Sequence, residues 1–139
     1  AVYGDGQGNI YICEREGNSM RQVDGGGTIT TVSGTGEKGY SGDGGPAAQA
    51  TFNGPKGIAY SASDDSLYIV DTENHAIRRL SLGSGVLDTV LGTGERGDGP
   101  DGDPMRCRLA RPHGVCAHEG VLYVTDSENH RVRALEGVL

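Results

Sequence analysis

Short apolar runs alternate with polar turn residues along this chain at a nearly constant spacing. The clearest run, at 67–70, consists of leucine, tyrosine, isoleucine and valine and predicts a strand that is covered on both faces. The polar triplet at 72–74 predicts a turn, and the apolar and basic segment at 76–80 predicts a second strand. The stretch from 67 to 80 is therefore predicted to be a β-hairpin.

The same hairpin occurs three times. It recurs downstream at 122–135 and, in a more divergent form, upstream at 10–23. The first apolar residues of the three copies, Ile10, Leu67 and Leu122, are separated by 57 and then by 55 positions. A fixed period of this length indicates a repeat architecture, in which each unit packs on its neighbours.

One repeat unit is predicted to be a four-stranded antiparallel meander. Its first strand follows a proline, at 53–60 and again at 110–117, which is acceptable because the first residue of a strand can lack an N–H donor. The hairpin supplies the second and third strands, and β-rich segments at 28–32 and 86–90 supply the fourth. A lone four-stranded sheet leaves both faces in water, so the units must stack, and radial stacking is the β-propeller architecture.

The motif Pro-x-Gly-(Ile/Val), then Leu-Tyr-(Ile/Val)-x-Asp-(Thr/Ser)-Glu-Asn-His-x-(Ile/Val)-Arg, resembles the NHL repeat. The resemblance covers essentially the whole chain, in two good copies and one divergent copy. It implies an all-β propeller of four-stranded antiparallel blades, commonly six-bladed. The chain would hold about two and three-quarter of these blades, against the roughly four to eight that propellers use.

The predicted blades have unequal completeness. Blade 1 covers about 1–52 and lacks the start of its inner strand, blade 2 covers about 53–109, and blade 3 covers about 110–139 and lacks its outer strand. We therefore expect neighbouring blades to come from a longer parent chain, or from a second copy in a homodimer that completes a six-bladed ring.

Composition and charge exclude several classes of partner. The 25 glycines lie between apolar runs, and 35% of residues are hydrophobic, which fits tight turns better than disorder. The formal net charge of -7, with no window rich in Lys or Arg, disfavours nucleic-acid and membrane surfaces. No signal-peptide pattern or apolar segment of about 20 residues is present, so we expect a soluble chain of undetermined compartment.

The three cysteines do not indicate a disulfide framework or a zinc site. Cys13, Cys107 and Cys116 are odd in number, have no CxxC spacing and fall in different parts of the repeat. Cys13 and Cys116 lie in apolar strand-like segments, where free cysteine usually acts as a small hydrophobe.

The polar turn of the hairpin contains residue types that also bind metals. The residues that recur in its two good copies include Asp71, Glu73, Asn74 and His75, and Asp126, Glu128, Asn129 and His130. We favour a structural role, because Asp and Asn side chains close turns through local backbone hydrogen bonds and the divergent first copy has no histidine.

One arginine recurs in every hairpin. Arg78 and Arg133 occupy the same repeat position, and Arg21 occupies it in the divergent copy. A carboxylate of the same hairpin, such as Asp71 or Asp126, is expected to accept a bidentate pair and tie strands or blades together.

The best candidates for ligand contact are positions where the repeats disagree. Lys56 and His113 both lie between the proline and the glycine that precede the inner strand, yet they differ in chemistry. The innermost strand of a propeller lines the central channel, so the resemblance implies that these side chains lie near its mouth. Arg96 and Asp98, in the unequal loop before blade 3, complete the candidate set.

A metal site is the weaker interpretation of the acidic loop. Asp98, Asp101 and Asp103 are separated by glycine and proline, as in oxygen-rich calcium loops, but they lack the alternation and final glutamate of an EF-hand. We expect neither calcium nor zinc.

No nucleophile motif, phosphate-binding loop or zinc-protease motif is present. We therefore expect a non-enzymatic propeller module that binds a protein or small-molecule partner through its channel-mouth loops. The alternative is a metal-dependent lyase or lactone hydrolase of the six-bladed type, in which His113 would be the best ligand.

Overall fold

The computed structural model describes all 139 residues, and its strands form three antiparallel sheets. Blade 1 is the sheet β1 (Val2–Gly4), β2 (Ile10–Glu14), β3 (Ser19–Val23) and β4 (Ile29–Ser33). Blade 2 contains β6 (Gly57–Ser61), β7 (Ser66–Asp71), β8 (Ala76–Ser81) and β9 (Val86–Leu91), and blade 3 contains β10 (Gly114–His118), β11 (Val121–Asp126) and β12 (Arg131–Glu136). The predicted all-β architecture of antiparallel blades is confirmed.

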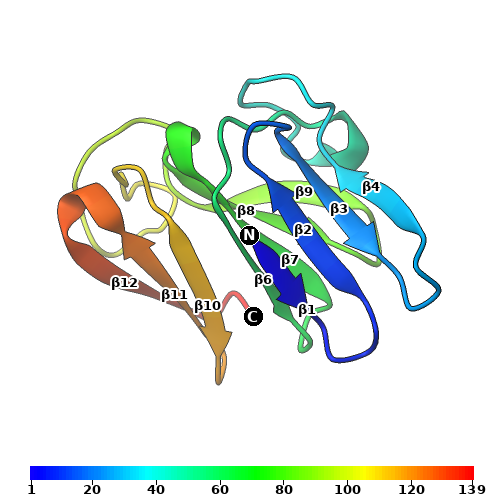
Figure 1. Cartoon of the computed structure of the whole chain (residues 1–139). Helices are drawn as coiled ribbons and strands as arrows, with labels where there is room; N and C mark the ends of the chain where they lie inside the picture. The colour runs from blue at the N-terminus through cyan, green and yellow to red at the C-terminus, as the bar shows by residue number, and fades with distance from the viewer.

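The three sheets lie side by side, with their first strands β1, β6 and β10 together on one side (Figure 1). The short 3-10 turns η2 (Thr72–Asn74) and η3 (Ser127–Asn129) lie at the same end of the molecule, where the long loops between blades also pass (Figure 1). This end carries the strand-leading residues and is called the mouth face below.

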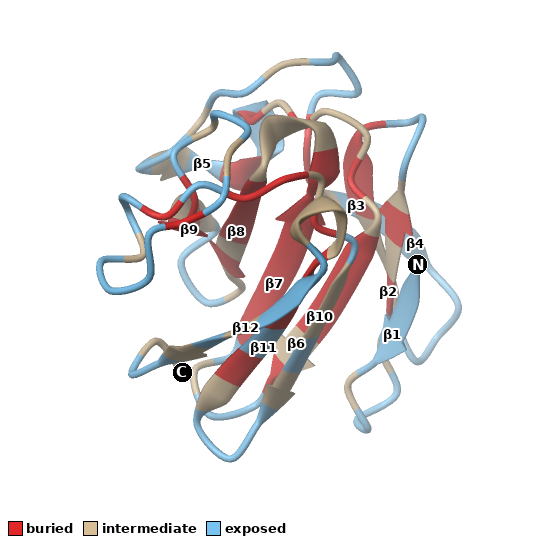
Figure 2. Cartoon of the chain, turned by 90° about the vertical axis from the view of Figure 1, so that its left-hand side faces the viewer, coloured by how far each residue is buried: buried red, intermediate tan, exposed pale blue.

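Each pair of neighbouring blades encloses its own apolar core. Between blades 1 and 2, residues such as Tyr11 and Met20 pack against Leu67 and Ile69. Between blades 2 and 3, a second core forms from the opposite face of β7 and β8 and from β11, and its members include Tyr68, Val70, Ile77, Leu122 and Val124. Blade 2 is therefore covered on both faces, as the continuous apolar run at 67–70 predicts, and its strands are the most buried in the molecule (Figure 2).

The outward face of blade 3 has no neighbour. Tyr123 and Val132 occupy the repeat positions of Tyr68 and Ile77, which are fully buried, but they are 40% and 67% exposed. Figure 2 shows the contrast between the buried strands of blade 2 and the exposed β12.

The hairpin turn has the same length and strand register in all three blades, and it forms a 3-10 helix in blades 2 and 3. Its flanking pairs are Glu14 with Ser19, Asp71 with Ala76, and Asp126 with Arg131. The last turn residue, at Asn18, His75 or His130, has a left-handed backbone with φ between 49° and 56°, a conformation in which asparagine and histidine are enriched.

The loop between blades 1 and 2 adds a strand that the repeat pattern does not predict. Residues Gly45–Pro46 form β5, which pairs antiparallel with Val86 and Leu87 at the outer edge of β9, so the central sheet has five strands. Pro46 is compatible with this place because an edge strand tolerates a missing donor. The same loop then enters the short helix η1 (Ala47–Gln49) and returns to the inner strand β6.

No helix of the structure is long and apolar enough to cross a membrane.

Candidate functional site

The hairpin aspartate and arginine of blade 2 meet in a fully buried ion pair. Arg78 Nη1 donates to Asp71 Oδ2 at 3.0 Å, and both side chains are completely inaccessible. Asp71 also accepts from the backbone N–H of Asn53 and from Asn74 Nδ2, each at 2.8 Å. Burial raises the pKa of Asp71, while these three donors act in the opposite direction.

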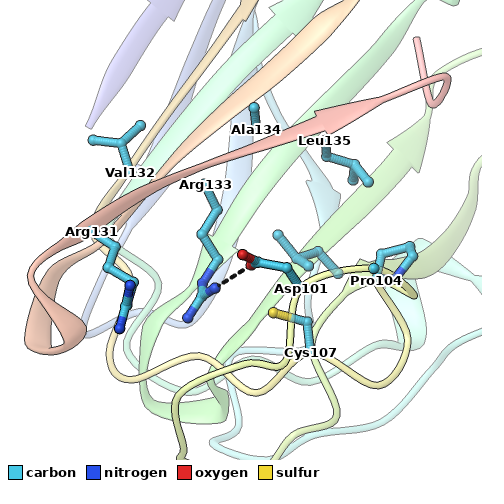
Figure 3. Close-up of a pocket in the computed structure, with 10 residues that line it drawn as sticks. Asp101, Pro104, Cys107, Arg131, Val132, Arg133, Ala134 and Leu135 are labelled. Carbon is cyan, nitrogen blue, oxygen red and sulfur yellow. Dashed lines mark hydrogen bonds and ion pairs between the residues drawn. The ribbon is translucent and has the colours of Figure 1, made fainter.

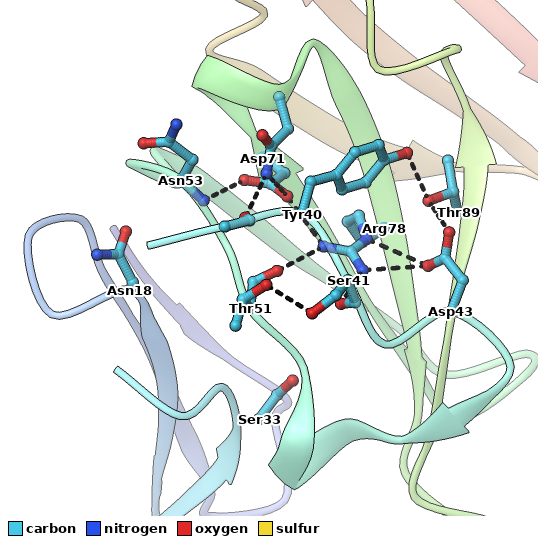
Figure 4. Close-up of polar contacts among 12 residues, drawn as sticks. Asn18, Ser33, Tyr40, Ser41, Asp43, Thr51, Asn53, Asp71, Arg78 and Thr89 are labelled. Carbon is cyan, nitrogen blue, oxygen red and sulfur yellow. Dashed lines mark hydrogen bonds and ion pairs between the residues drawn. The ribbon is translucent and has the colours of Figure 1, made fainter. Parts of the chain in front are cut away.

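Arg78 also fastens the loop that precedes its own blade. It donates to the carbonyls of Ser41 and Thr51 at 2.8 and 3.0 Å and to Asp43 at 3.1 Å, and its guanidinium lies 4.8 Å from the ring centroid of Tyr40 (Figure 4). Its bond to Asp71 is therefore single, and not the bidentate pair expected from the sequence, because its remaining donors serve the loop.

Blades 3 and 1 repeat this pair with decreasing burial. Arg133 Nε donates to the buried Asp126 at 2.8 Å, and Arg133 is 9% exposed. In blade 1, Arg21 Nε donates to Glu14 at 2.9 Å, with both side chains 39% exposed. The three arginines thus make equivalent contacts in different environments.

The turn residues also hold neighbouring blades together. His75 Nδ1 accepts the backbone N–H of Arg111 at 3.0 Å, and Asn18 Oδ1 accepts the equivalent N–H of Gly54 at 2.9 Å. Burial, followed by the charge of Arg96, lowers the pKa of His75, which favours the neutral imidazole that this bond needs.

Lys56 and His113, the sequence candidates for ligand contact, lie together on the mouth face. Lys56 Nζ is 3.4 Å from His113 Nε2, because β6 and β10 are adjacent inner strands. Partial burial and then the neighbouring cations lower the pKa of both groups, with Arg111 acting on each. The pair forms no ion pair with a carboxylate, so its polar atoms are available to a ligand.

A charged cluster surrounds this pair at the seam between blades 2 and 3. Arg111 bridges the two turns, with Nε 2.6 Å from Glu73 and Nη1 2.7 Å from Glu128. Arg96, another sequence candidate, contacts Glu128 at 2.5 Å. The hydrogen bond from Arg111 is the largest cause that lowers the pKa of both Glu73 and Glu128.

Asp98, the fourth ligand candidate, lies apart from Lys56 and His113. It is paired with Arg131 at 3.0 Å and with Arg133 at 2.7 Å. Asp101 also pairs with Arg133, at 2.7 Å, whereas Asp103 accepts the backbone N–H of Met105. The three loop aspartates therefore do not converge on one point, and no group of three or more His, Cys, Asp or Glu side chains is placed to hold a metal ion.

A cavity of about 330 Å³ lies beside β12 (Figure 3). It is bounded on one side by β12 and on the other by the loop around Asp101, Pro104 and Cys107, with the Asp101–Arg133 ion pair across it (Figure 3).

Sequence reasoning missed Glu73, Glu128 and Arg111 as a connected group. The two glutamates recur at one repeat position, which is a readable signal. Arg111 replaces Gly54 at the equivalent position, and that difference is also visible. The missing information was that adjacent turns come within reach of one arginine.

Comparison with known proteins agrees with this repeat geometry. The family described as NHL repeat matches residues 52–80 and 109–135, which contain the two well-formed hairpins and the prolines before them. The chain contains NHL repeats. The family resemblance read from the sequence is thereby confirmed.

Two curated relatives are much longer than this chain. Protein SUPPRESSOR OF QUENCHING 1, chloroplastic, of Arabidopsis thaliana is 36% identical over 90 residues, which cover 63% of this chain and 8% of the relative. NHL repeat-containing protein 2 of Bos taurus is 27% identical over 98 residues, which cover 63% of this chain and 13% of the relative. The NHL chain thus spans about a tenth of each relative.

Solved structures share the fold at low sequence identity. An auxiliary nutrient binding protein from Bacteroides thetaiotaomicron superposes with a TM-score of 0.79 at 22% identity, covering 96% of this NHL chain and 36% of that protein. A streptogramin B lyase superposes with a TM-score of 0.59 at 12% identity, covering 99% of this chain and 40% of the lyase. At these identities the likeness concerns the fold alone.

Proposed function

We propose that this NHL-repeat chain is a non-enzymatic binding module, whose mouth face recognises a protein or small-molecule partner. The observation that carries the proposal is the Lys56–His113 pair. The backbone N–H of Lys56 donates to the carbonyl of Val70 at 3.1 Å, and that of His113 donates to the carbonyl of Thr125 at 3.2 Å, so the two backbones are placed equivalently. Their side chains differ and meet at the mouth, which is what a recognition surface on a shared scaffold requires.

Screening a library of soluble metabolites and short peptides by amide NMR tests this role. We expect bound compounds to shift the amides of Lys56, His113 and Arg111, and the double variant Lys56→Ala/His113→Ala to lose those shifts while retaining the fold. The matched control is His118→Ala, a histidine that is 70% exposed on the inner strand β10. Stoichiometric zinc that disappears in His113→Ala, with turnover of a bound compound, would contradict the non-enzymatic assignment.

We also propose that the open face of blade 3 is covered by a further NHL blade, from a longer parent chain or from a second copy that helps to complete a ring. The support is the burial of Tyr68 and Ile77 under blade 3, compared with the exposure of Tyr123 and Val132 at the same repeat positions. Apolar patches of this kind usually mark an interface.

Light scattering separates the two sources of the covering blade. A dimer that dissociates on Val132→Glu supports a second copy. A monomer whose melting temperature does not depend on concentration excludes the second copy, since assembly stabilises by mass action.

A further inference from the structure

A polar cavity of about 400 Å³ lies at the seam between blades 1 and 2, on the mouth face. It is lined by no hydrophobic residue; its lining consists of Arg15, Glu16, Asn18, Lys38, Asn53, Gly54 and Glu73. Glu16 and Glu73 come from the turns of neighbouring blades and occupy the same repeat position. The volume falls within the range of about 300–1,000 Å³ usual for small-ligand sites.

The seam between blades 2 and 3 shows what this space accommodates. The equivalent glutamates there are Glu73 and Glu128, and the guanidinium of Arg111 is bonded to both. Gly54 stands at the repeat position of Arg111 and has the same left-handed backbone, with φ of 59° against 44°. The cavity is therefore the place of an arginine side chain that the first seam lacks.

The hydrogen bonds that frame the two places are the same. The backbone N–H of residue 54 or 111 is held by the preceding turn at 2.9 or 3.0 Å. The carbonyl of Asn53 accepts from the N–H of Glu73 at 3.0 Å, as Ala110 does from Glu128 at 3.1 Å. Glu73 is thus held at the first seam by the same backbone bond that holds Glu128 at the second.

The cations at the rim define the rest of the ligand. Lys38 corresponds to Arg96, which shares Glu128 with Arg111, so a cation at this position is compatible with a guanidinium between the glutamates. Arg15 corresponds to Thr72 and has no counterpart cation at the second seam. Arg15 and Lys38 form no ion pair with a carboxylate of the protein, so they can accept a negative group of the ligand.

The geometry points to a binding site for a ligand that carries a guanidinium group and a nearby carboxylate, such as the C-terminal arginine of a peptide. The guanidinium lies between Glu16 and Glu73, where its planar fork can donate to both carboxylates. Glu73 already accepts from Arg111 Nε at 2.6 Å, so it would serve two guanidinium groups, as Glu128 serves Arg111 and Arg96. The ligand carboxylate lies at the rim against Arg15 and Lys38. The site shares Glu73 with the Arg111 cluster, but neither Lys56 nor His113 lines the cavity, and the proposal does not depend on the function proposed for that pair.

The probe for this site is Nα-acetyl-L-arginine, which is titrated into the full chain at low ionic strength while the amide NMR signals are recorded. We expect shifts at Asn18 and Asn53, and an affinity at least about tenfold higher than that for Nα-acetyl-L-citrulline, which has the same shape without the charge. Gly54→Arg should abolish binding, because its own side chain fills the place as Arg111 does. Gly54→Ala controls for the added Cβ, which would lie 3.2 Å from Glu73 Cγ and require a small shift of that side chain, and it should still bind.

Single charge changes assign the two ends of the ligand. Glu16→Gln should weaken binding about tenfold, whereas Glu136→Gln, at an exposed site on β12, should not change it. Arg15→Ala should weaken the binding of Nα-acetyl-L-arginine but not the binding of Nα-acetyl-L-arginine amide, which lacks the carboxylate. Equal affinity for the arginine and citrulline compounds, or unchanged binding by Gly54→Arg, would overturn the proposal. Either result leaves the Lys56–His113 proposal standing, because neither residue lines this cavity and that proposal is tested with its own double variant.

Discussion

Replacing Arg78 by methionine breaks the buried ion pair with Asp71 together with the bonds that Arg78 makes to the loop before blade 2. Methionine keeps much of the length and the apolar stem, but it removes the charge opposite Asp71, which is completely buried. It also removes the donors to the Ser41 and Thr51 carbonyls. Loss of one partner of a buried pair typically destabilises by about 3–5 kcal/mol, because the other charge remains buried and uncompensated.

That loss is large against the stability of about 5–15 kcal/mol typical of a domain. For a chain of this size it corresponds to a fall in melting temperature on the order of 10 °C. The assay is urea unfolding followed by circular dichroism, with calorimetry to check that the transition is two-state.

The repeat supplies matched controls for Arg78→Met. Arg21→Met breaks the equivalent pair where both partners are 39% exposed, and it should cost no more than about 1 kcal/mol. Arg133→Met, at 9% exposure, should fall between the two. Asp71→Asn introduced into Arg78→Met should recover part of the loss, since it removes the uncompensated charge. Equal losses for Arg21→Met and Arg78→Met would refute the reasoning that burial decides the effect.

Two further predictions concern the seams. The pKa of His75 is lowered in the native state, so the stability that His75 contributes is retained above its ordinary pKa of about 6.5 and is lost as pH falls through the lower native value. His75→Asn should therefore make the free energy of unfolding in urea differ less between pH 7.5 and pH 5.5. An unchanged pH dependence would contradict the role of the bond between His75 and Arg111. Gly57→Ala would place a Cβ 2.5 Å from the carbonyl oxygen of His113 and should destabilise by about 1–3 kcal/mol. Gly114→Ala meets only Thr125 of its own blade, at 3.0 Å, and should be milder, so comparable melting temperatures for the two variants would exclude close packing of β6 on β10 as the cause.

The fold was predictable because its signal is repeated. The run at 67–70, the turn after it and the recurring arginine place the strands, and the structure has them at those residues. The short strand β5 was not predictable, since Gly45 and Pro46 have low strand propensity and the loop is held by contacts to distant residues, among them Arg78 and Thr89. Local pattern cannot report such a contact between distant segments.

The candidate site was predictable in part, for a related reason. Lys56 and His113 were found because equivalent positions differ, and their contact follows from the adjacency of inner strands. Asp98 was grouped with them because it lies in the loop before blade 3, which differs from the loop before blade 2, but Asp98 pairs with Arg131 and Arg133 instead. The direction of a charged loop side chain depends on which oppositely charged groups the fold brings near it. The sequence pattern does not contain these spatial neighbours.

The loop at 40–53 changes what the unit of unfolding should be. It leaves blade 1, pairs with the outer edge of blade 2 through β5 and closes over Arg78 before the inner strand begins. Melting blade 1 would therefore strip the outer edge of blade 2, and melting blade 2 would release the loop of blade 1. Hydrogen exchange should accordingly show cooperative units that are centred on the seams between blades and are therefore displaced by half a repeat from the four-stranded sheets.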